Sequence, residues 1–432
     1  MSKAVNVGII GFGTVGSGTA RIILQNGALI ERRTGIKIKL KWIADLDIER
    51  DRGVQIPQGV LTTDAYDIIN DPAVDVVVEL IGGIQPAKKF MLEALKKGKH
   101  IVTANKALLA THGTEIFAGA EAQHKSVGFE AAVAGGIPII KVMREGLAAN
   151  NILSIYGIIN GTSNYILTRM TKEGAPFDMV LKDAQRLGYA EADPTFDIEG
   201  IDTAHKLTLL ASLSYGIPLS FDKVYKEGIT AITPEDIAYA SELGYKIKLL
   251  AIAKVVNSEI ELRVHPTMLP EDYLISKVDD VLNAVYVVGD AVGETMYYGR
   301  GAGDMPTGSA VVSDIIDIAD RGEGRCCPFL NADGSGYKIK DISDIETMYY
   351  FRFTVMDRPG VLSKISGVLG EHNISISAVI QKERRADEAV PLVVLTHRAK
   401  ERDIINAVKE IDTLPAVAAK TRFIRVEGKE YN

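Results

Sequence analysis

The densest group of polar side chains falls in the stretch GYAEADPTFDIEGIDTAHKLTLL, residues 188–210. Glu191 and Asp197 lie in its first half, where a proline keeps the chain out of a helix. Asp202 and Lys206 follow on an expected helix, and because they are four residues apart they share one face of it. Carboxylates beside an ammonium group can bind a zwitterionic substrate and deliver a proton to it.

Other interpretations of this stretch stay open on the residues alone. Asp202 and Lys206 are also spaced as a surface ion pair, which would contribute about 0.3–0.5 kcal/mol. Two carboxylates suit glycoside hydrolysis as well, although the nucleotide-binding pattern of the chain disfavours it. A divalent-metal cluster lacks matching His or Cys ligands, and His205, a lone histidine on the helix, is given no role.

A glycine-rich turn after the first strand indicates a dinucleotide-binding site. The strand VNVGII runs into a turn that fits G-x-G-x-x-G and then into an expected helix. The first glycine of this motif permits the turn, the second lets a pyrophosphate approach, and the third lets helix and strand pack closely. A tight turn without a ligand is the alternative. The turn comprises Gly11, Phe12, Gly13, Thr14, Val15 and Gly16.

Charged residues beyond this turn bear on which dinucleotide binds. Asp45 ends the second expected strand, where its carboxylate can accept a hydrogen bond from a ribose 2′-OH, which favours NAD. Arg50 and Arg52 follow closely and could instead meet a 2′-phosphate. NAD and NADP therefore both stay open, as does a simple turn role for Asp45.

The stretch TANKALLA places Thr103 and Lys106 just after another strand of the sheet. Ligands of doubly wound sheets bind beyond the carboxyl ends of the strands, so both residues are expected near the reactive end of the coenzyme. A solvated lysine at the start of a helix is the alternative for Lys106.

Three more glycine-containing loops are candidates for ligand contacts. FEAAVAGGIPII joins Glu130 to a turn that can aim carbonyls at a cation, although a buried turn between domains is favoured by the residues alone. NGTSNYIL holds Gly161 and Thr162, whose amide and hydroxyl groups could face a ligand. YGRGAGDMPTG, with Gly303, is either a second backbone approach to the coenzyme or a crossing between domains.

The spacing of apolar residues predicts the elements that hold these loops. Strands alternate with helices up to about residue 130, which is typical of a parallel, doubly wound α/β sheet. The strands are expected at 5–10, 36–45, 74–82 and 101–105, and the helices at 14–26 and 87–100. A second α+β domain follows, with helices at 163–173, 177–187, 200–215 and 306–320 and strands at 246–257, 259–269 and 284–299. Residues 347–427 then alternate as βαββαβ, the ferredoxin-like order.

The composition excludes several classes of protein. A net charge of −7 over 432 residues argues against nucleic-acid binding, which needs a basic face. No apolar run approaches the about 20 residues that span a bilayer, and the start MSKAVNVGII is too short for a signal peptide. The two cysteines, Cys326 and Cys327, are adjacent and are expected to be reduced thiols, so a cytoplasmic protein is inferred.

These motifs together resemble the homoserine dehydrogenase family. VGIIGFGTVGSG, TANKALLA, FEAAVAGGIPII, NGTSNYIL and LGYAEADPTFDIEGIDTAHKL occur in family order as far as about residue 325. The segment DRPGVLSKISGVLGEHNISI resembles an ACT domain, a small-ligand sensor. The resemblance implies reversible, NAD(P)H-dependent reduction of L-aspartate 4-semialdehyde to L-homoserine, in threonine, methionine and isoleucine biosynthesis.

The resemblance also implies residue roles. Lys206 matches the proton donor, and Lys106 matches the lysine near nicotinamide and substrate. A lysine ordinarily titrates near pH ~10.4, so Lys206 can donate to an aldehyde oxygen without a shift. For homoserine oxidation we expect either a high pH optimum or a Lys206 pKa that is lowered by burial and by nearby Lys106. Substrate binding is expected of Glu191, Asp202, Asp197, Gly161 and Thr162, and further coenzyme contacts of Gly188 and Gly303. A site for sodium or potassium is implied at the Glu130 side chain and the carbonyls of Val133, Gly135 and Ile137.

Four parts of the chain are expected. They are an NAD(P)-binding Rossmann domain at 1–130 with 306–320 packing back on it, a substrate-binding and dimerisation domain at 131–305, a linker at 321–346, and an ACT regulatory domain at 347–432. In the last, Asp357, Gly360 and Asn373 are expected to bind an amino-acid effector, threonine by family inference, within a homodimer or homotetramer. A dimerising tail without a ligand is the alternative.

Rival functions fit the residues less well. Aspartate-semialdehyde dehydrogenase needs a cysteine nucleophile, and the cysteines lie only in the expected linker. A sugar dehydrogenase of the Gfo type would carry a Glu-Lys-Pro motif, which is absent from this sequence. A non-catalytic dinucleotide sensor would keep the glycines but would need no lysine–carboxylate cluster.

Overall fold

The computed structural model describes residues 3–321, 336–382 and 388–428. Cys326 and Cys327 lie outside the described residues. Contacts divide the chain into two units. The first contains residues 1–161, 201–224 and 281–337, and the second contains 162–200, 225–280 and 338–432. None of the helices in the described parts combines the length and apolar character that a bilayer crossing needs.

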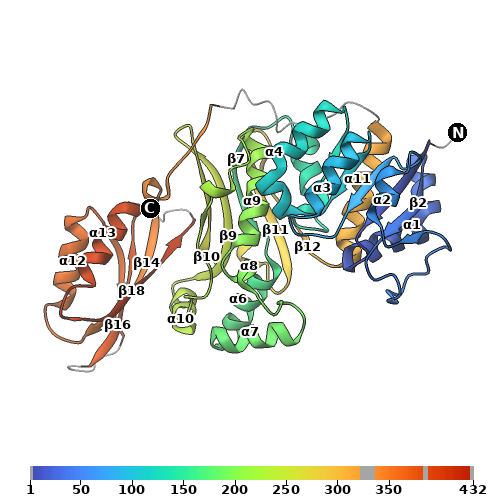
Figure 1. Ribbon diagram of the computed structural model, residues 1–432. Helices are drawn as coiled ribbons and strands as arrows, with labels where there is room; N and C mark the ends of the chain where they lie inside the picture. The colour runs from blue at the N-terminus through green and yellow to red at the C-terminus, as the bar shows by residue number, and fades with distance from the viewer. Residues whose placement is uncertain (1–2, 322–335, 383–387, 429–432) are drawn as a thin grey trace. The chain divides into compact units, whose positions relative to one another are not determined.

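The first unit (Figure 1) is built on a parallel sheet, the α/β class that the sequence predicts, and the sheet has six strands in the order β3-β2-β1-β4-β5-β6. Its strands are β1 (Lys3–Ile10), β2 (Ile36–Ala44), β3 (Leu61–Thr62), β4 (Val76–Glu79), β5 (His100–Thr103) and β6 (Val127–Gly128). The helices around them are α1 (Thr14–Thr34), α2 (Ala65–Asn70), α3 (Ala87–Lys96), α4 (Lys106–Ala122) and α11 (Asp304–Arg321). The valines of β4 are wholly buried because strands of a doubly wound sheet are covered on both faces.

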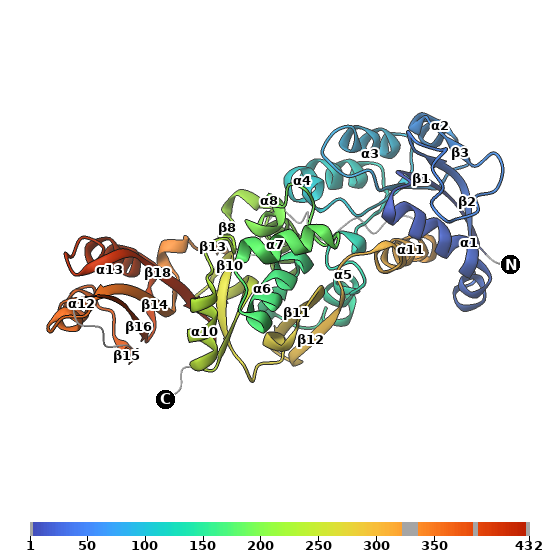
Figure 2. The same cartoon turned by 90° about the horizontal axis from the view of Figure 1, so that it is seen from below.

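Helix α11 packs along α1, far from it in sequence, as Figures 1 and 2 both show. Two glycines allow this close approach. A Cβ added at Gly18 would lie 2.1 Å from the carbonyl oxygen of Asp304, and one at Gly308 would lie 2.8 Å from the backbone nitrogen of Thr19. Side chains of α1 and α11 therefore share one apolar core with the parallel sheet.

The rest of the first unit holds a buried helix and an antiparallel sheet. Helix α9 (Ile201–Tyr215) contacts α4 and strand β7 (Ile152–Ile158). Strand β7 pairs with β11 (Leu282–Gly289), which pairs in turn with β12 (Gly293–Arg300). The single strand predicted at 284–299 was wrong: the chain reverses at Gly293, whose φ of 73° suits glycine. Short turns of helix complete the unit at η1 (Glu130–Ala132), α5 (Ile139–Lys141), η2 (Val142–Gly146) and η3 (Phe221–Lys223).

The second unit contains a long antiparallel hairpin, β9 (Tyr245–Val256) and β10 (Glu259–Pro270). Its two-residue turn, Asn257-Ser258, has φ values of 52° and 63°, which a tight hairpin with right-handed twist requires. Strands β8 (Tyr225–Lys226) and β13 (Lys338–Ile339) pair parallel to β10, so part of the expected linker 321–346 is structured. The helices are α6 (Gly161–Glu173), α7 (Phe177–Arg186), α8 (Thr195–Ile198) and α10 (Pro234–Glu242), with η4 (Ile275–Lys277).

The C-terminal part of this unit has the predicted βαββαβ order and forms an antiparallel sheet, β18-β14-β16-β15. Figure 2 shows α12 and α13 together beside this sheet, and their apolar side chains pack on Tyr349, Phe351 and Phe353. The elements are β14 (Glu346–Met356), α12 (Val361–Glu371), β15 (Ile376–Ile380), β16 (Ala389–Thr396), β17 (Ala399–Lys400), α13 (Glu401–Ile411) and β18 (Val417–Val426), with η6 (Ile342–Asp344) before them.

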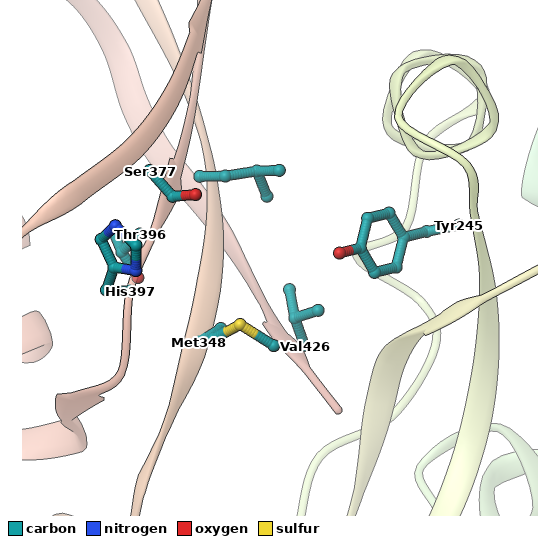
Figure 3. A pocket seen from close by; sticks show the side chains of 7 residues that line it. Tyr245, Met348, Ser377, Thr396, His397 and Val426 are labelled. Atoms are coloured by element: carbon teal, nitrogen blue, oxygen red, sulfur yellow. The ribbon is translucent and has the colours of Figure 1, made fainter. Parts of the chain in front are cut away.

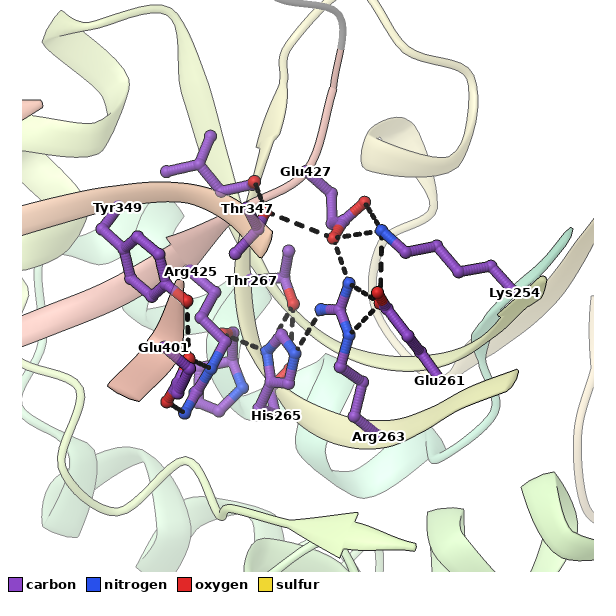
Figure 4. Close-up of polar contacts among 12 residues, drawn as sticks. Lys254, Glu261, Arg263, His265, Thr267, Thr347, Tyr349, Glu401, Arg425 and Glu427 are labelled. Carbon is purple, nitrogen blue, oxygen red and sulfur yellow. Dashed lines mark hydrogen bonds and ion pairs between the residues drawn. The ribbon is translucent and has the colours of Figure 1, made fainter. Parts of the chain in front are cut away.

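Strand β18 also pairs in parallel with β10, so the C-terminal sheet and the β9–β10 hairpin share a backbone ladder. Buried charges reinforce this junction (Figure 4). Arg263 of β10 pairs with Glu427 and contacts Glu261 at 3.1 Å. Arg425 of β18 donates to Glu401 and, at 2.7 Å, to Glu227. Breaking one member of such buried pairs leaves an uncompensated charge, so the junction is expected to be rigid.

Candidate active site

The glycine-rich turn between β1 and α1 has the geometry that a dinucleotide needs. Gly11 has a φ of 104°, and a Cβ there would lie 2.7 Å from the backbone of Leu80. A Cβ at Gly16 would lie 2.1 Å from the carbonyl oxygen of Gly11. At Gly13 an added Cβ meets no heavy atom within 4 Å, and no side chain caps the helix there. The N-terminus of α1 therefore has room for an anionic group.

Asp45 supports the glycine-rich turn from the end of β2. Its carboxylate accepts the N–H of Phe12 at 2.6 Å and the N–H of Asp47 at 2.9 Å. The guanidinium of Arg52 lies 3.1 Å from the same carboxylate and 5.0 Å from the centre of the Phe12 ring. Asp45 thus stabilises the turn, which was one of the two roles that the sequence allowed. It also holds Arg52 at this edge of the sheet. Arg50, in contrast, is exposed.

Two lysines bracket one buried carboxylate in the same unit. Lys206 Nζ lies 2.6 Å from Asp202 Oδ2 and donates to the carbonyl oxygen of Ile159 at 2.7 Å. Lys106 Nζ lies 3.2 Å from Asp202 Oδ1, and Asn160 donates to Asp202 Oδ2 at 2.9 Å. Asp202 is only 7% exposed, so Asp202 and Lys206 are not the solvent-exposed pair that their spacing also allowed.

The charges of this cluster are mutually stabilised. Burial alone raises the pKa of the Asp202 carboxyl. The ammonium groups of Lys206 and Lys106, with hydrogen bonds from Lys206 and Asn160, outweigh burial and hold that pKa well below its usual range. Asp202 is therefore a fixed negative charge that aims two ammonium groups.

Residues at the end of β5 fix the position of Lys106. Asn105 caps α4 by accepting the N–H of Leu108 at 3.1 Å, and Lys106 is the first residue of that helix. Thr103 is fully buried, and its hydroxyl donates to Glu79 at 2.7 Å. The expected coenzyme contact of Thr103 is therefore limited to its backbone.

The loop expected to bind a cation carries a buried acid. Glu130 is 1% exposed, and its carboxylate accepts the N–H groups of Ile140 and Lys141 at 2.8 and 2.9 Å. Its own N–H donates to Asp314 of α11 at 2.8 Å, and burial, then the Glu130 charge, raises the pKa of Asp314 to about 8. The backbone of Val133, Gly135 and Ile137 follows, with Ala134 and Gly135 at φ values of 53° and 41°.

The remaining first-unit candidates are Gly303, which follows a segment that contacts this loop, and Gly161. A Cβ at Gly135 would lie 2.5 Å from the carbonyl oxygen of Gly301, and Gly136 donates its N–H to Arg300 at 2.9 Å. Gly303, with a φ of 122°, follows directly and leads into α11. Gly161 starts α6, where an added Cβ would lie 3.0 Å from the carbonyl oxygen of Val281.

Candidates of the second unit lie on the loop between α7 and α8, on α8 and on the start of α6. Asp197 is part of α8, so the expectation that a proline keeps this stretch out of a helix was wrong. The hydroxyl of Thr162 donates to the carbonyl oxygen of Tyr189 at 2.7 Å, next to Gly188, whose φ is 75°. Ser163 donates to the carbonyl oxygen of Asp197 at 2.9 Å. The start of α6 therefore holds this loop, on which the Glu191 side chain is exposed.

The expected effector residues lie at opposite ends of one helix. Gly360, with a φ of 88°, caps the start of α12, and Asp357 precedes it. Asn373, with a φ of 59°, follows the end of this helix of 11 residues, which spans about 16 Å. A single amino acid cannot reach both ends within one copy.

A small pocket lies between the C-terminal sheet and Tyr245 of β9 (Figure 3), and none of the expected effector residues lines it. Its lining residues are Tyr245, Met348, Ser377, Leu395, Thr396, His397 and Val426.

The chain is similar to known proteins along almost its whole length. The family model described as "Homoserine dehydrogenase, NAD binding domain" matches residues 11–130, "Homoserine dehydrogenase" matches 138–316, and "ACT domain" matches 349–415. A homoserine dehydrogenase of Neisseria gonorrhoeae is 49% identical over 432 residues, covering 99% of both chains.

Solved structures are similar as well. A homoserine dehydrogenase from Thiobacillus denitrificans superposes with a TM-score of 0.92 at 49% identity, covering 98% of both chains. A hyperthermophilic archaeal homoserine dehydrogenase in complex with NADPH has a TM-score of 0.61 at 26% identity, covering 74% of this chain and 99% of the other.

Proposed function

The chain belongs to the homoserine dehydrogenase family and is an NAD(P)-dependent enzyme, and from that premise we propose how its residues carry the reaction. The reaction is the reversible reduction of L-aspartate 4-semialdehyde to L-homoserine. The observation that carries the assignment is the buried Asp202 carboxylate between Lys206 and Lys106. A dinucleotide sensor would have no use for two lysines aimed by one buried acid.

Lys206 is the proton donor in this proposal. The bound dinucleotide supplies the hydride. As the aldehyde oxygen gains negative charge, an N–H bond of the Lys206 ammonium breaks and an O–H bond of homoserine forms. Asp202 and the Ile159 carbonyl oxygen hold Nζ at 2.6 and 2.7 Å, which fixes the direction of donation. Lys106 places a second positive charge near the developing alkoxide.

Substrate binding is assigned through the family resemblance. Glu191 and Asp202 bind the amino group or the hydroxyl-bearing chain of the substrate, and Asp197 adds a further carboxylate. Gly161 and Thr162 contribute from the start of α6. Carboxylates are suited to this task because the substrate carries an ammonium group.

NAD and NADP are both proposed to bind with the ribose beside Asp45, at the carboxyl end of β2. Asp45 suits the ribose 2′-OH of NAD, and Arg52, 3.1 Å from that carboxylate, suits the 2′-phosphate of NADP. The archaeal relative bound to NADPH supports the second mode. Gly13 and the N-terminus of α1 receive the pyrophosphate, and Gly188 and Gly303 approach the coenzyme through their backbones.

A sodium or potassium ion is proposed at the Glu130 loop. Its ligands would be the carbonyl oxygens of Val133, Gly135 and Ile137 with the Glu130 side chain, an all-oxygen set that suits a hard cation. Consecutive positive φ values at Ala134 and Gly135 reorient the carbonyls of this turn. The described residues contain no group of three His, Cys, Asp or Glu side chains able to hold a metal, so carbonyls would dominate the ligand set.

Feedback regulation is proposed to act through the ACT domain of a homodimer or homotetramer. Because Asp357 and Asn373 lie at opposite ends of α12, an effector such as threonine would be bound between the ACT domains of two copies. The β18–β10 ladder and the Arg263–Glu427 pair would transmit movement of the ACT sheet to the β9–β10 hairpin.

This junction changes how regulation is tested. Truncation near residue 340 would remove the whole of β18 together with Glu427 and so expose the β10 side of the junction, and loss of activity in that variant would not be informative. Asn373→Ala keeps the junction and is expected to weaken threonine inhibition while basal turnover persists.

The reaction itself is tested by following the absorbance of the reduced coenzyme. Purified protein, L-homoserine and NAD or NADP are mixed with and without threonine and with sodium or potassium salts. Hydride transfer with either coenzyme supports the proposal. Coenzyme binding without turnover would favour the sensor instead.

A further inference from the structure

One buried acid at the coenzyme edge of the parallel sheet has no role in the mechanism above. Glu79 is the last residue of β4 and is 0% exposed. Burial raises the pKa of its carboxyl, while hydrogen bonds from Thr103, Gly82 and Ile81 oppose the rise. Burying an acid costs free energy unless it is hydrogen-bonded, so the hydrogen bonds of Glu79 indicate what it does.

The carboxylate of Glu79 binds two separate segments at once. Its Oε1 accepts the backbone N–H of Ile81 at 2.9 Å and that of Gly82 at 3.0 Å. Its Oε2 accepts the hydroxyl of Thr103, at the end of β5, at 2.7 Å. Glu79 therefore connects the loop after β4 to the adjacent strand.

From Thr103 the hydrogen bonds continue to Asn105, the residue that directly precedes Lys106. Thr103 Oγ1 accepts the N–H of Asn105 at 3.0 Å. Asn105 caps α4, whose first residue is Lys106, and its amide donates back to the carbonyl oxygen of Gly83 at 2.7 Å. The hydrogen bonds thus form a closed circuit between the loop 80–83 and the helix start.

The loop 80–83 also touches the glycine-rich turn. Gly11 packs so closely on the Leu80–Ile81 peptide that a Cβ would lie 2.7–2.8 Å from its atoms. Gly82 and Gly83 both have left-handed φ values, of 71° and 70°, and are exposed. Glu79 therefore binds the loop from its buried side, and Gly82 and Gly83 leave the other side exposed to solvent.

We propose that Glu79 is a positioning residue for hydride transfer. Its hydrogen bonds fix the position of the loop 80–83 relative to the start of α4. The nicotinamide end of the coenzyme and Lys106 are thereby placed on the substrate at the same time. The inference rests on the proposed function, in which both lie at this edge. Because Glu79 is 0% exposed, it acts through Thr103 and Asn105 and not by direct contact.

Two substitutions weaken this set of hydrogen bonds. The first, Glu79→Gln, keeps the buried side-chain volume, and the second, Asn105→Ser, keeps a capping residue on α4. Glu79→Gln keeps an oxygen for the Ile81 and Gly82 N–H groups but removes the acceptor for the Thr103 hydroxyl. Asn105→Ser keeps a capping side chain for α4 and removes the amide that binds Gly83. Glu79→Ala removes every bond of the carboxylate and completes the series.

Lys99→Met is the matched control. Lys99 directly precedes β5 and is 3% exposed, and its ammonium donates to the carbonyl oxygens of Asp71 and Val74. The substitution Lys99→Met therefore removes buried hydrogen bonds at the start of β5, whereas Thr103 lies at its end. Its melting temperature is expected to fall while its kinetics stay those of the wild type.

The experiment measures kcat, coenzyme KM, the primary isotope effect with deuterated reduced coenzyme, and melting temperature. Glu79→Gln and Asn105→Ser are expected to lower kcat by about tenfold to hundredfold, the effect of a reactant displaced by up to about 1 Å. The isotope effect should rise because hydride transfer becomes slower, and Glu79→Gln should retain more activity than Glu79→Ala.

Two results would overturn the inference. One is a set of circuit variants that melt earlier but keep the wild-type kcat, KM and isotope effect. The other is an equal kinetic loss in Lys99→Met. The wild-type protein is assayed first, since absence of turnover there contradicts the proposed function rather than the role of Glu79.

Discussion

Replacing Asp202 by Asn tests whether one buried negative charge aims both lysines. The substitution keeps the size of the side chain and removes the charge that lies 2.6 Å from Lys206 Nζ and 3.2 Å from Lys106 Nζ. Each ammonium then loses a charge-assisted hydrogen bond, which is worth about 1.5–3 kcal/mol. At ~1.4 kcal/mol per factor of ten, kcat/KM for homoserine is expected to fall by about 10- to 150-fold.

The same substitution is expected to change the pH dependence. In homoserine oxidation the proton acceptor must first lose its own proton, and the Asp202 carboxylate stabilises the protonated form. Without that charge, and with two ammonium groups left side by side, the acid limb of the rate profile should move to lower pH. A loss of about 1.5–3 kcal/mol corresponds to a shift of about 1–2 pH units.

The assay is the initial rate of coenzyme reduction across a pH series with saturating coenzyme. Asp183→Asn, which removes an exposed carboxylate paired with Arg186, is the control and should leave rate and profile unchanged. An Asp202→Asn enzyme with the wild-type rate and the wild-type acid limb would refute the reasoning that Asp202 governs the lysines.

Three further outcomes are expected. Lys206→Ala should lower turnover by about 10²–10⁴-fold while coenzyme still binds, as measured by coenzyme titration; retained activity would remove Lys206 as the proton donor. Arg52→Ala should raise the KM for NADP more than that for NAD, and an equal change in both would argue against a 2′-phosphate contact. Burial raises the pKa of Glu427, but Arg263 and Lys254 more than offset it and lower that pKa from 4.5 to about 2. Folding therefore favours the carboxylate, and its stabilisation is complete above pH 4.5 and is lost as the pH falls toward 2. Urea unfolding at neutral and acidic pH should show this loss, and Glu427→Gln should reduce it; an unchanged pH dependence would contradict it.

Local patterns in the sequence predicted the features that depend on neighbouring residues. The glycine-rich turn was identified because its glycines lie within one short strand–turn–helix segment, although Gly11 also packs on the distant Leu80–Ile81 peptide. The pair Asp202–Lys206 was expected on one helix face for the same reason. Its burial was not predictable, because Lys106 approaches from a strand-to-helix turn far away in the sequence.

Features that depend on tertiary packing were missed. The hairpin of β11 and β12 was predicted as one strand because apolar residues continue through its turn. The role of Glu79 is not predictable from the sequence, because one acid after a run of valines forms no recognisable pattern. The spacing around Asp314 predicts only a helix and does not indicate that Asp314 accepts the N–H of Glu130 from a distant loop.

The buried charges of the junction show the same limit. Arg263 and Arg425 alternate with apolar residues as exposed strand residues do, yet both are 1% exposed. They are buried because β10 and β18 pair and cover each other, and this pairing joins segments far apart in the chain. Sequence spacing gives the face of a strand but not what covers that face.

The proposed mechanism depends most directly on the position of the Lys206 nitrogen relative to the reacting carbonyl. A crystal structure with coenzyme and homoserine bound measures that position. We expect Lys206 Nζ within about 2.6–3.2 Å of the homoserine hydroxyl oxygen, with the nicotinamide facing the carbon that carries it. An Nζ turned away from the substrate, or a different acid at that oxygen, would contradict the proposed mechanism.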